Sequence, residues 1–162
     1  MRNAWLLISV LALLLINAPV RGAETEPESV AAGMQSAAKP LLKALSMIGT
    51  PYKFGGSKPE KGVDCSGFVR HVYKESADVS LPRTARDMSR SGEQVAKSEL
   101  KPGDLVFFNT RKSPNSHVGI YAGNDEFIHA SSRRSKQVTV SRMSDSYWSA
   151  RFNGARRVLS AP

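Results

Sequence analysis

The stretch from Asp64 to Tyr73 reads DCSGFVRHVY and predicts the start of a helix. Its bulky apolar residues recur at helical spacing, at positions 68, 69, 72 and 73. Asp64 is a good N-terminal cap, so Cys65 falls in the first turn, where backbone N–H groups and the helix dipole favour a thiolate. The same N–H groups can stabilise an oxyanion. Cys65 is therefore placed as a nucleophile, and the alternative is a buried structural cysteine.

The segments on either side of this helix predict an α+β domain. Upstream, residues 40–48 have helical apolar spacing, begin with Pro40 and are followed by Gly49. Downstream, a loop and a short helix over 85–91 precede five predicted strands, at 105–108, 117–121, 126–130, 138–140 and 155–159. Because the helices come first and strands joined by a hairpin follow, we expect helices packed on an antiparallel sheet.

Two of the three histidines, His117 and His129, lie on the strands of the predicted hairpin, whose turn we place near Gly123. This register sets them opposite each other on one face, with Cβ atoms about 5 Å apart. One ring can take the Cys65 proton, and the other can hydrogen-bond the first and fix its tautomer. His71 is expected to be an exposed helix residue without a role. The alternatives are ordinary surface histidines, or a three-ligand metal site with Cys65.

The N-terminus predicts a secretory signal peptide over residues 1–22. Arg2 precedes an apolar run from Ala4 to Ile16, which is shorter than the roughly 20 residues of a membrane span. We expect a flexible leader over residues 23–38 and one folded domain over residues 39–162. The alternative is an uncleaved N-terminal anchor.

Composition narrows the classes of partner. The 162 residues carry a formal charge of +9, from 23 Lys and Arg against 14 Asp and Glu. Because export is expected, we expect an anionic cell wall as partner, with no role for nucleic acid. The single cysteine excludes an internal disulfide and any zinc site that needs two cysteines from one chain.

The motifs, taken in order, resemble the NlpC/P60 family of cell-wall cysteine peptidases. The similar segments are residues 49–52, 55–56, 64–69, 81–84, 100–108, 117–121, 127–131, 147–148 and 155–158. The resemblance covers roughly residues 40–159 and implies a papain-like fold, in which helices carry the cysteine and an antiparallel sheet carries the histidines. One position departs from the pattern, because Met88 stands where many relatives carry Gln.

The resemblance also assigns roles to individual residues. It makes Cys65 the nucleophile, His117 the general base and His129 the residue that orients this base. It implies substrate or oxyanion contacts for a second group, namely Tyr52, Asp64, Ser66 and Arg83.

The residues of this second group have alternative interpretations. Tyr52 would otherwise be a packing tyrosine at a turn, Asp64 only a helix cap, and Arg83 a solvated loop charge. Trp148 could line the groove or close the core, and we favour the core. Basic residues in segments 111–116 and 132–134 are expected at the rim of the cleft, where they suit a substrate that bears carboxylates.

The function that the resemblance implies is an exported, periplasmic cysteine endopeptidase of peptidoglycan stem peptides, without metal or cofactor. Short periplasmic murein endopeptidases of this kind cut the D-Ala–meso-diaminopimelate crosslink, whereas many relatives cut the γ-D-Glu–diaminopimelate bond, and we favour the crosslink. We expect a monomer with no membrane span after signal cleavage, regulated by an adaptor or a protease. Alternatives from other classes are a catalytically idle murein-binding protein and a zinc-binding protein.

Overall fold

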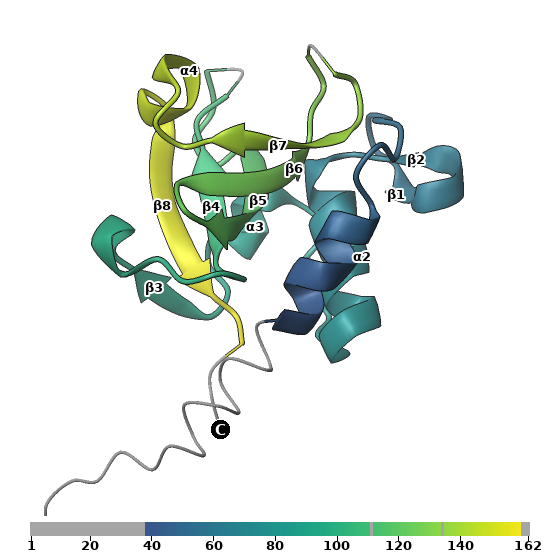
Figure 1. The fold of residues 1–162 in the computed structure, drawn as a ribbon, viewed down its shortest axis with the longest axis horizontal. Coiled ribbons are helices and arrows are strands. Elements are labelled where there is room, and N and C mark those ends of the chain that lie inside the picture. Colours follow the sequence, from purple (N-terminus) through teal and green to yellow (C-terminus); the bar gives the residue numbers. More distant parts are fainter. Residues whose placement is uncertain (1–37, 111, 134, 160–162) are drawn as a thin grey trace, which may run out of the picture.

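The computed structural model describes residues 38–110, 112–133 and 135–159 (Figure 1). Residues 38–46 are helical, and the elements that follow are β1 (Ser57–Lys58), η1 (Pro59–Lys61), β2 (Gly62–Val63), α2 (Cys65–Ala77), α3 (Ala85–Met88), β3 (Glu93–Val95), η2 (Lys97–Glu99), β4 (Leu105–Phe108), β5 (His117–Gly123), β6 (Glu126–Ala130), β7 (Val138–Arg142), α4 (Ser146–Ser149) and β8 (Phe152–Arg157). The predicted signal peptide and the leader up to residue 37 lie outside the described residues. In the described part, no helix combines the length and the hydropathy of a membrane span.

One antiparallel sheet organises the domain. Its strands lie in the order β3-β8-β4-β5-β6-β7, and α2 packs against β5 and β6 (Figure 1). The strands β1 and β2 form a small hairpin that contacts α2. Helices that precede an antiparallel sheet confirm the predicted α+β class.

The sheet buries apolar side chains on both faces. The face toward α2 packs the helix residues Phe68, Val69, Val72 and Tyr73 against Leu105, Phe107, Val118, Ile120 and Ile128. The opposite face forms a second cluster from Val106, Phe108, Phe127, Met143 and Ala155, against which Trp148 packs. Alternate residues of β4 therefore belong to different clusters, as the twofold period of a strand requires.

Several predicted boundaries move in the structure. The helix expected over 85–91 ends at Met88, and the strand expected over 155–159 is Phe152–Arg157. The first helix, expected over 40–48, spans 38–46, and a turn then leads to Gly49, whose φ of +90° suits glycine. The short elements β1, β2, β3 and α4 were not predicted. They are two to four residues long, which is too short for a local hydrophobic period to show. Contacts with other segments define them instead, such as the pairing of β3 with β8.

The beginning of α2 lies directly against the loop that precedes β1. The Gly56 carbonyl accepts a hydrogen bond from the Asp64 N–H at 3.0 Å. A Cβ atom on Gly67 would overlap with this same carbonyl oxygen. Only a residue without a side chain allows the loop to approach the helix so closely.

We expect Gly67→Ala to lower the free energy of unfolding by about 2–3 kcal/mol, because the new methyl group must displace the Gly56 backbone. Urea unfolding of the whole chain measures this. Glu75→Ala is the control, since Glu75 is exposed on the same helix and should change stability by less than about 0.5 kcal/mol. Equal stability of the two variants would contradict the close approach.

Candidate functional site

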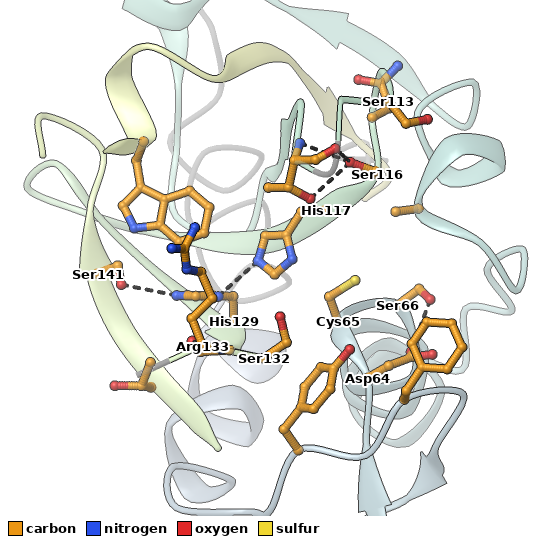
Figure 2. Close-up of a pocket in the computed structure, with 18 of the residues that line it drawn as sticks. Asp64, Cys65, Ser66, Ser113, Ser116, His117, His129, Ser132, Arg133 and Ser141 are labelled. Carbon is orange, nitrogen blue, oxygen red and sulfur yellow. Dashed lines mark hydrogen bonds between the residues drawn. The ribbon is translucent and has the colours of Figure 1, made fainter. Parts of the chain in front are cut away.

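The candidate nucleophile is the first residue of α2. Cys65 follows the N-cap Asp64, whose carboxylate accepts a hydrogen bond from the Gly67 N–H at 2.7 Å, as predicted. Cys65 is half-buried and lines a cleft together with His117 and His129. Figure 2 shows Cys65 and the His117 ring as neighbours in this cleft. Backbone N–H groups at the start of a helix favour a thiolate there and can stabilise a developing oxyanion.

His117 and His129 form the pair that the hairpin predicted. The Nε2 atom of His117 lies 2.9 Å from Nδ1 of His129, and the two rings are nearly perpendicular at 83°. Both side chains are buried. Because His117 uses Nε2 for this contact, Nδ1 is its candidate atom for proton exchange with Cys65.

The predicted register of the hairpin was wrong. Ile120 pairs with Ile128, so Gly119 rather than His117 stands opposite His129. A Cβ on Gly119 would lie 3.2 Å from the His129 Cβ. The two histidines are instead diagonal neighbours on one face, a separation that long or aromatic side chains can bridge.

The cause of this register is a turn and a bulge that the sequence analysis did not place. The tight turn is at Asn124 and Asp125, which both have positive φ, rather than at Gly123. The register then shifts between Tyr121 and Gly123, which leaves Ala122 as one extra residue. Without this extra residue the two histidines would point to opposite faces, since a one-residue slip reverses every side chain.

His129 also contacts the next strand. Its Nε2 lies 3.0 Å from the Ser141 hydroxyl on β7, a residue that the sequence analysis missed. Burial lowers the pKa of His129 well below its ordinary value of 6.5, and a charge on His117 lowers it further. His129 is therefore a neutral ring whose two nitrogens both have partners.

Trp148 from α4 joins the histidines to the core. Its ring stacks on His117 with centroids 5.3 Å apart and meets the edge of His129 at 4.9 Å. It also contacts Phe108 and Phe127 in the second cluster. The expectation of a core residue is correct but incomplete, because Trp148 also covers the His117 ring and lines the cleft.

Arg83 and Ser66 meet at the Asp64 carboxylate. Arg83 donates from both terminal nitrogens to the two Asp64 oxygens, at 2.8 and 3.1 Å, and to the Ser66 hydroxyl at 2.8 Å. The hydrogen bond to Asp64 raises the pKa of Arg83. The alternative of a solvated loop charge is therefore wrong, and Asp64 is more than a helix cap. Direct contact of these three residues with substrate stays a prediction.

Tyr52 and several basic side chains complete the cleft. Tyr52 is half-buried, lines the cleft beside Cys65 and forms an isolated bridge with Val63. Its oxyanion role stays a prediction. Arg86 and Arg133 also line the cleft. The other basic residues expected at this rim are Lys112, which is exposed, and Arg111 and Arg134, which lie outside the described residues.

A metal site is not apparent in the part of the chain that the structure describes. There, no three or more His, Cys, Asp or Glu side chains are grouped as metal ligands. The Nε2 of His117 and the Nδ1 of His129 are in hydrogen-bond contact with each other, so these two atoms do not converge on a common ion.

The fold and the site together define an α+β domain of the papain-like type, in which a cysteine at a helix start faces histidines on an antiparallel sheet. A family model described as the NlpC/P60 family matches residues 49–157. The chain belongs to the NlpC/P60 family.

Curated relatives extend this similarity. The chain is 46% identical over 130 residues to the gamma-DL-glutamyl hydrolase of Bacillus subtilis, covering 79% of the chain and 31% of that protein. It is 42% identical over 133 residues to the murein DD-endopeptidase MepH of Escherichia coli, covering 80% and 49%. It is 46% identical over 112 residues to the murein DD-endopeptidase MepS/murein LD-carboxypeptidase of Escherichia coli, covering 69% and 57%. The chain thus spans between one third and somewhat over half of these relatives.

Solved structures agree with the fold. An NlpC/P60 family protein from Bacillus cereus matches with a TM-score of 0.70 and 31% identity, over 76% of this chain and 40% of that chain. The peptidoglycan hydrolase RipB from Mycobacterium tuberculosis matches with a TM-score of 0.68 and 28% identity, over 80% and 68%.

The buried, neutral state of His129 predicts a pH dependence of stability. The unfolded chain gains a proton on this residue below about pH 6.5, whereas the folded chain gains it only at lower pH. The free energy of unfolding should therefore fall as the pH drops from about 6.5 to 5, with a contribution of up to about 1.4 kcal/mol per pH unit.

His129→Asn should remove this contribution, whatever its effect on absolute stability. Urea unfolding at several pH values between 5 and 7 compares the slopes. His71→Asn is the control, because His71 is less buried and its pKa is lowered less. An unchanged slope in His129→Asn would show that His129 is not held neutral.

Proposed function

We propose that this protein is an exported cysteine endopeptidase that hydrolyses a peptide bond in the stem peptides of peptidoglycan. The observation that carries the proposal is the alignment of Cys65, His117 and His129 in one cleft, with the cysteine at a helix start and the histidines in hydrogen-bond contact. A nucleophile, a base and an orienting group are the parts that acyl transfer needs.

The first half of the reaction forms a thioester. His117 accepts the thiol proton through Nδ1, and the Cys65 thiolate attacks the carbonyl carbon of the stem peptide. The backbone N–H of Cys65 stabilises the tetrahedral oxyanion, and the Tyr52 hydroxyl is the second donor that we propose. His117 then protonates the leaving amine, and the carbon–nitrogen bond breaks.

The second half releases the acyl group. His117, now neutral, takes a proton from water, and the resulting hydroxide attacks the thioester carbon. The carbon–sulfur bond breaks, the new carboxylic acid leaves, and the Cys65 sulfur recovers its starting state. His129 holds the His117 ring in one orientation throughout, and Trp148 stacks on its face.

Within this class, we propose the D-Ala–meso-diaminopimelate crosslink as the bond that is cut. Two relatives at 42% and 46% identity bear the name murein DD-endopeptidase, which supports this choice. The alternative is the γ-D-Glu–diaminopimelate bond, and it is supported by the gamma-DL-glutamyl hydrolase at 46% identity. Arg86 and Arg133 give the cleft positive charge, which suits the carboxylates of either substrate.

The setting of the activity is also part of the proposal. We propose a periplasmic monomer whose activity an adaptor or a protease restrains. The positive charge of the chain, formally +9 over all 162 residues, favours the anionic wall. A murein-binding protein without activity is the alternative from another class, and it predicts binding without hydrolysis.

Muropeptide analysis tests the proposal. Purified crosslinked murein incubated with the protein should lose crosslinked dimers and gain tetrapeptide monomers, as measured by mass spectrometry. Disaccharide-dipeptides in place of tetrapeptides would instead indicate the γ-D-Glu–diaminopimelate bond. Cys65→Ala should abolish product formation, because no other cysteine in the chain can replace the nucleophile.

Circular dichroism tests whether Cys65→Ala is folded. We expect that it is, because Cys65 is only partly buried and packs against the first hydrophobic cluster from outside. If this folded variant released products as fast as the wild type, the cysteine mechanism would be wrong. Murein binding by both proteins, with products from neither, would favour the inactive binding protein.

A further inference from the structure

Ser141, which lies outside the proposed triad, ends a row of hydrogen bonds that starts at His117 and leads away from Cys65. His117 contacts His129 at 2.9 Å, and His129 contacts the Ser141 hydroxyl at 3.0 Å (Figure 2). The three residues lie on the neighbouring strands β5, β6 and β7. His129 is only 1% exposed, so its ring nitrogens depend largely on partners within the protein.

Protonation of His117 dictates where the protons of this row must lie. An imidazolium carries a proton on both nitrogens, so Nε2 of His117 must donate to Nδ1 of His129. The neutral His129 then carries its own proton on Nε2. That buried N–H needs an acceptor, and the Ser141 oxygen is the partner that the structure gives it.

The opposite arrangement of protons would prevent the chemistry. If Ser141 donated to His129, the Nδ1–H of His129 would donate to Nε2 of His117. His117 would then carry its proton on Nδ1, the nitrogen that must accept the proton of Cys65. The direction of two hydrogen bonds therefore decides whether His117 can act as a base.

We propose that Ser141 is a positioning residue, which accepts the Nε2–H of His129 and thereby selects the tautomers that allow His117 to become an imidazolium beside Cys65. The proposal rests on the cysteine mechanism above. Ser141 also lines the cleft, and the role that we propose for it acts through the two rings. Its loss would leave a buried donor without an acceptor in the charged state.

Alkylation of the thiolate tests the proposal without any substrate. The chain has one cysteine, so the rate of iodoacetamide labelling reports on Cys65 alone. In Ser141→Ala, the pH midpoint of labelling should rise by about one unit, which corresponds to a roughly 10-fold loss of thiolate at low pH. Ser141→Thr keeps an acceptor and should retain the wild-type midpoint.

Matched variants separate this effect from a loss of packing. Ser76→Ala removes one hydroxyl, bonded to the Val72 carbonyl at 2.7 Å on α2, and should leave the midpoint unchanged. If Ser141→Ala does not fold, Ser141→Val and Ser141→Thr give the comparison, since they have the same shape and suit a strand. The other ionisable groups that line the cleft stay in place in every variant: Tyr52, Asp64, Arg83, Arg86, Arg133, Asp145 and Tyr147.

Nitrogen NMR of the histidine rings supplies a second readout, which holds even if murein is not the substrate. In the wild type, His129 should carry its proton on Nε2, and in Ser141→Ala this tautomer should lose population. Unchanged tautomers together with an unchanged labelling midpoint would overturn the proposal. If wild-type Cys65 titrated like an ordinary thiol, near pH 8.5, the cysteine mechanism would fail, and the tautomers alone would decide the role of Ser141.

Discussion

The carboxylate of Asp64 is the contact on which the rest of the site depends. It is nearly buried and accepts hydrogen bonds from four groups: the N–H of Gly67, the N–H of Gly55, the Ser66 hydroxyl and the Arg83 guanidinium. These donors belong to the nucleophile helix, the loop before β1 and the loop before α3. One side chain therefore caps the helix, fixes the two loops beside the cleft and sets the position of Cys65.

The sheet supplies the second constraint through its register. From His117 to His129 and on to Ser141, each step crosses one strand and moves along it diagonally, because the directly opposite residues are Gly119 and Thr139. This diagonal row exists only because the extra residue in β5 restores the parity of the hairpin. A bulge that looks like a local irregularity is thus what brings the two rings to one face.

The sequence was sufficient for features that depend on local chemistry. Asp64 as a cap and Cys65 in the first turn follow from residues next to each other, and the structure confirms both. The exact register did not follow, because it depends on whether the turn lies at Gly123 or one residue later. Ser141 and the stacking of Trp148 on His117 depend on pairing between distant strands and on the docking of α4. A polar residue on the same face of the next strand was the signal that could have suggested Ser141.

The charges of the site explain why a second histidine suits the orienting position. A carboxylate there would attract the proton of His117 strongly, but it would place a buried negative charge beside aromatic rings, at a high cost in desolvation. Burial keeps His129 neutral, and a proton on His117 makes a second proton on the pair still less favourable. The pair therefore favours at most one positive charge. In the mechanism that we propose, the row of hydrogen bonds holds this charge on His117, and its attraction to the Cys65 thiolate stabilises the nucleophile without any permanent charge behind it.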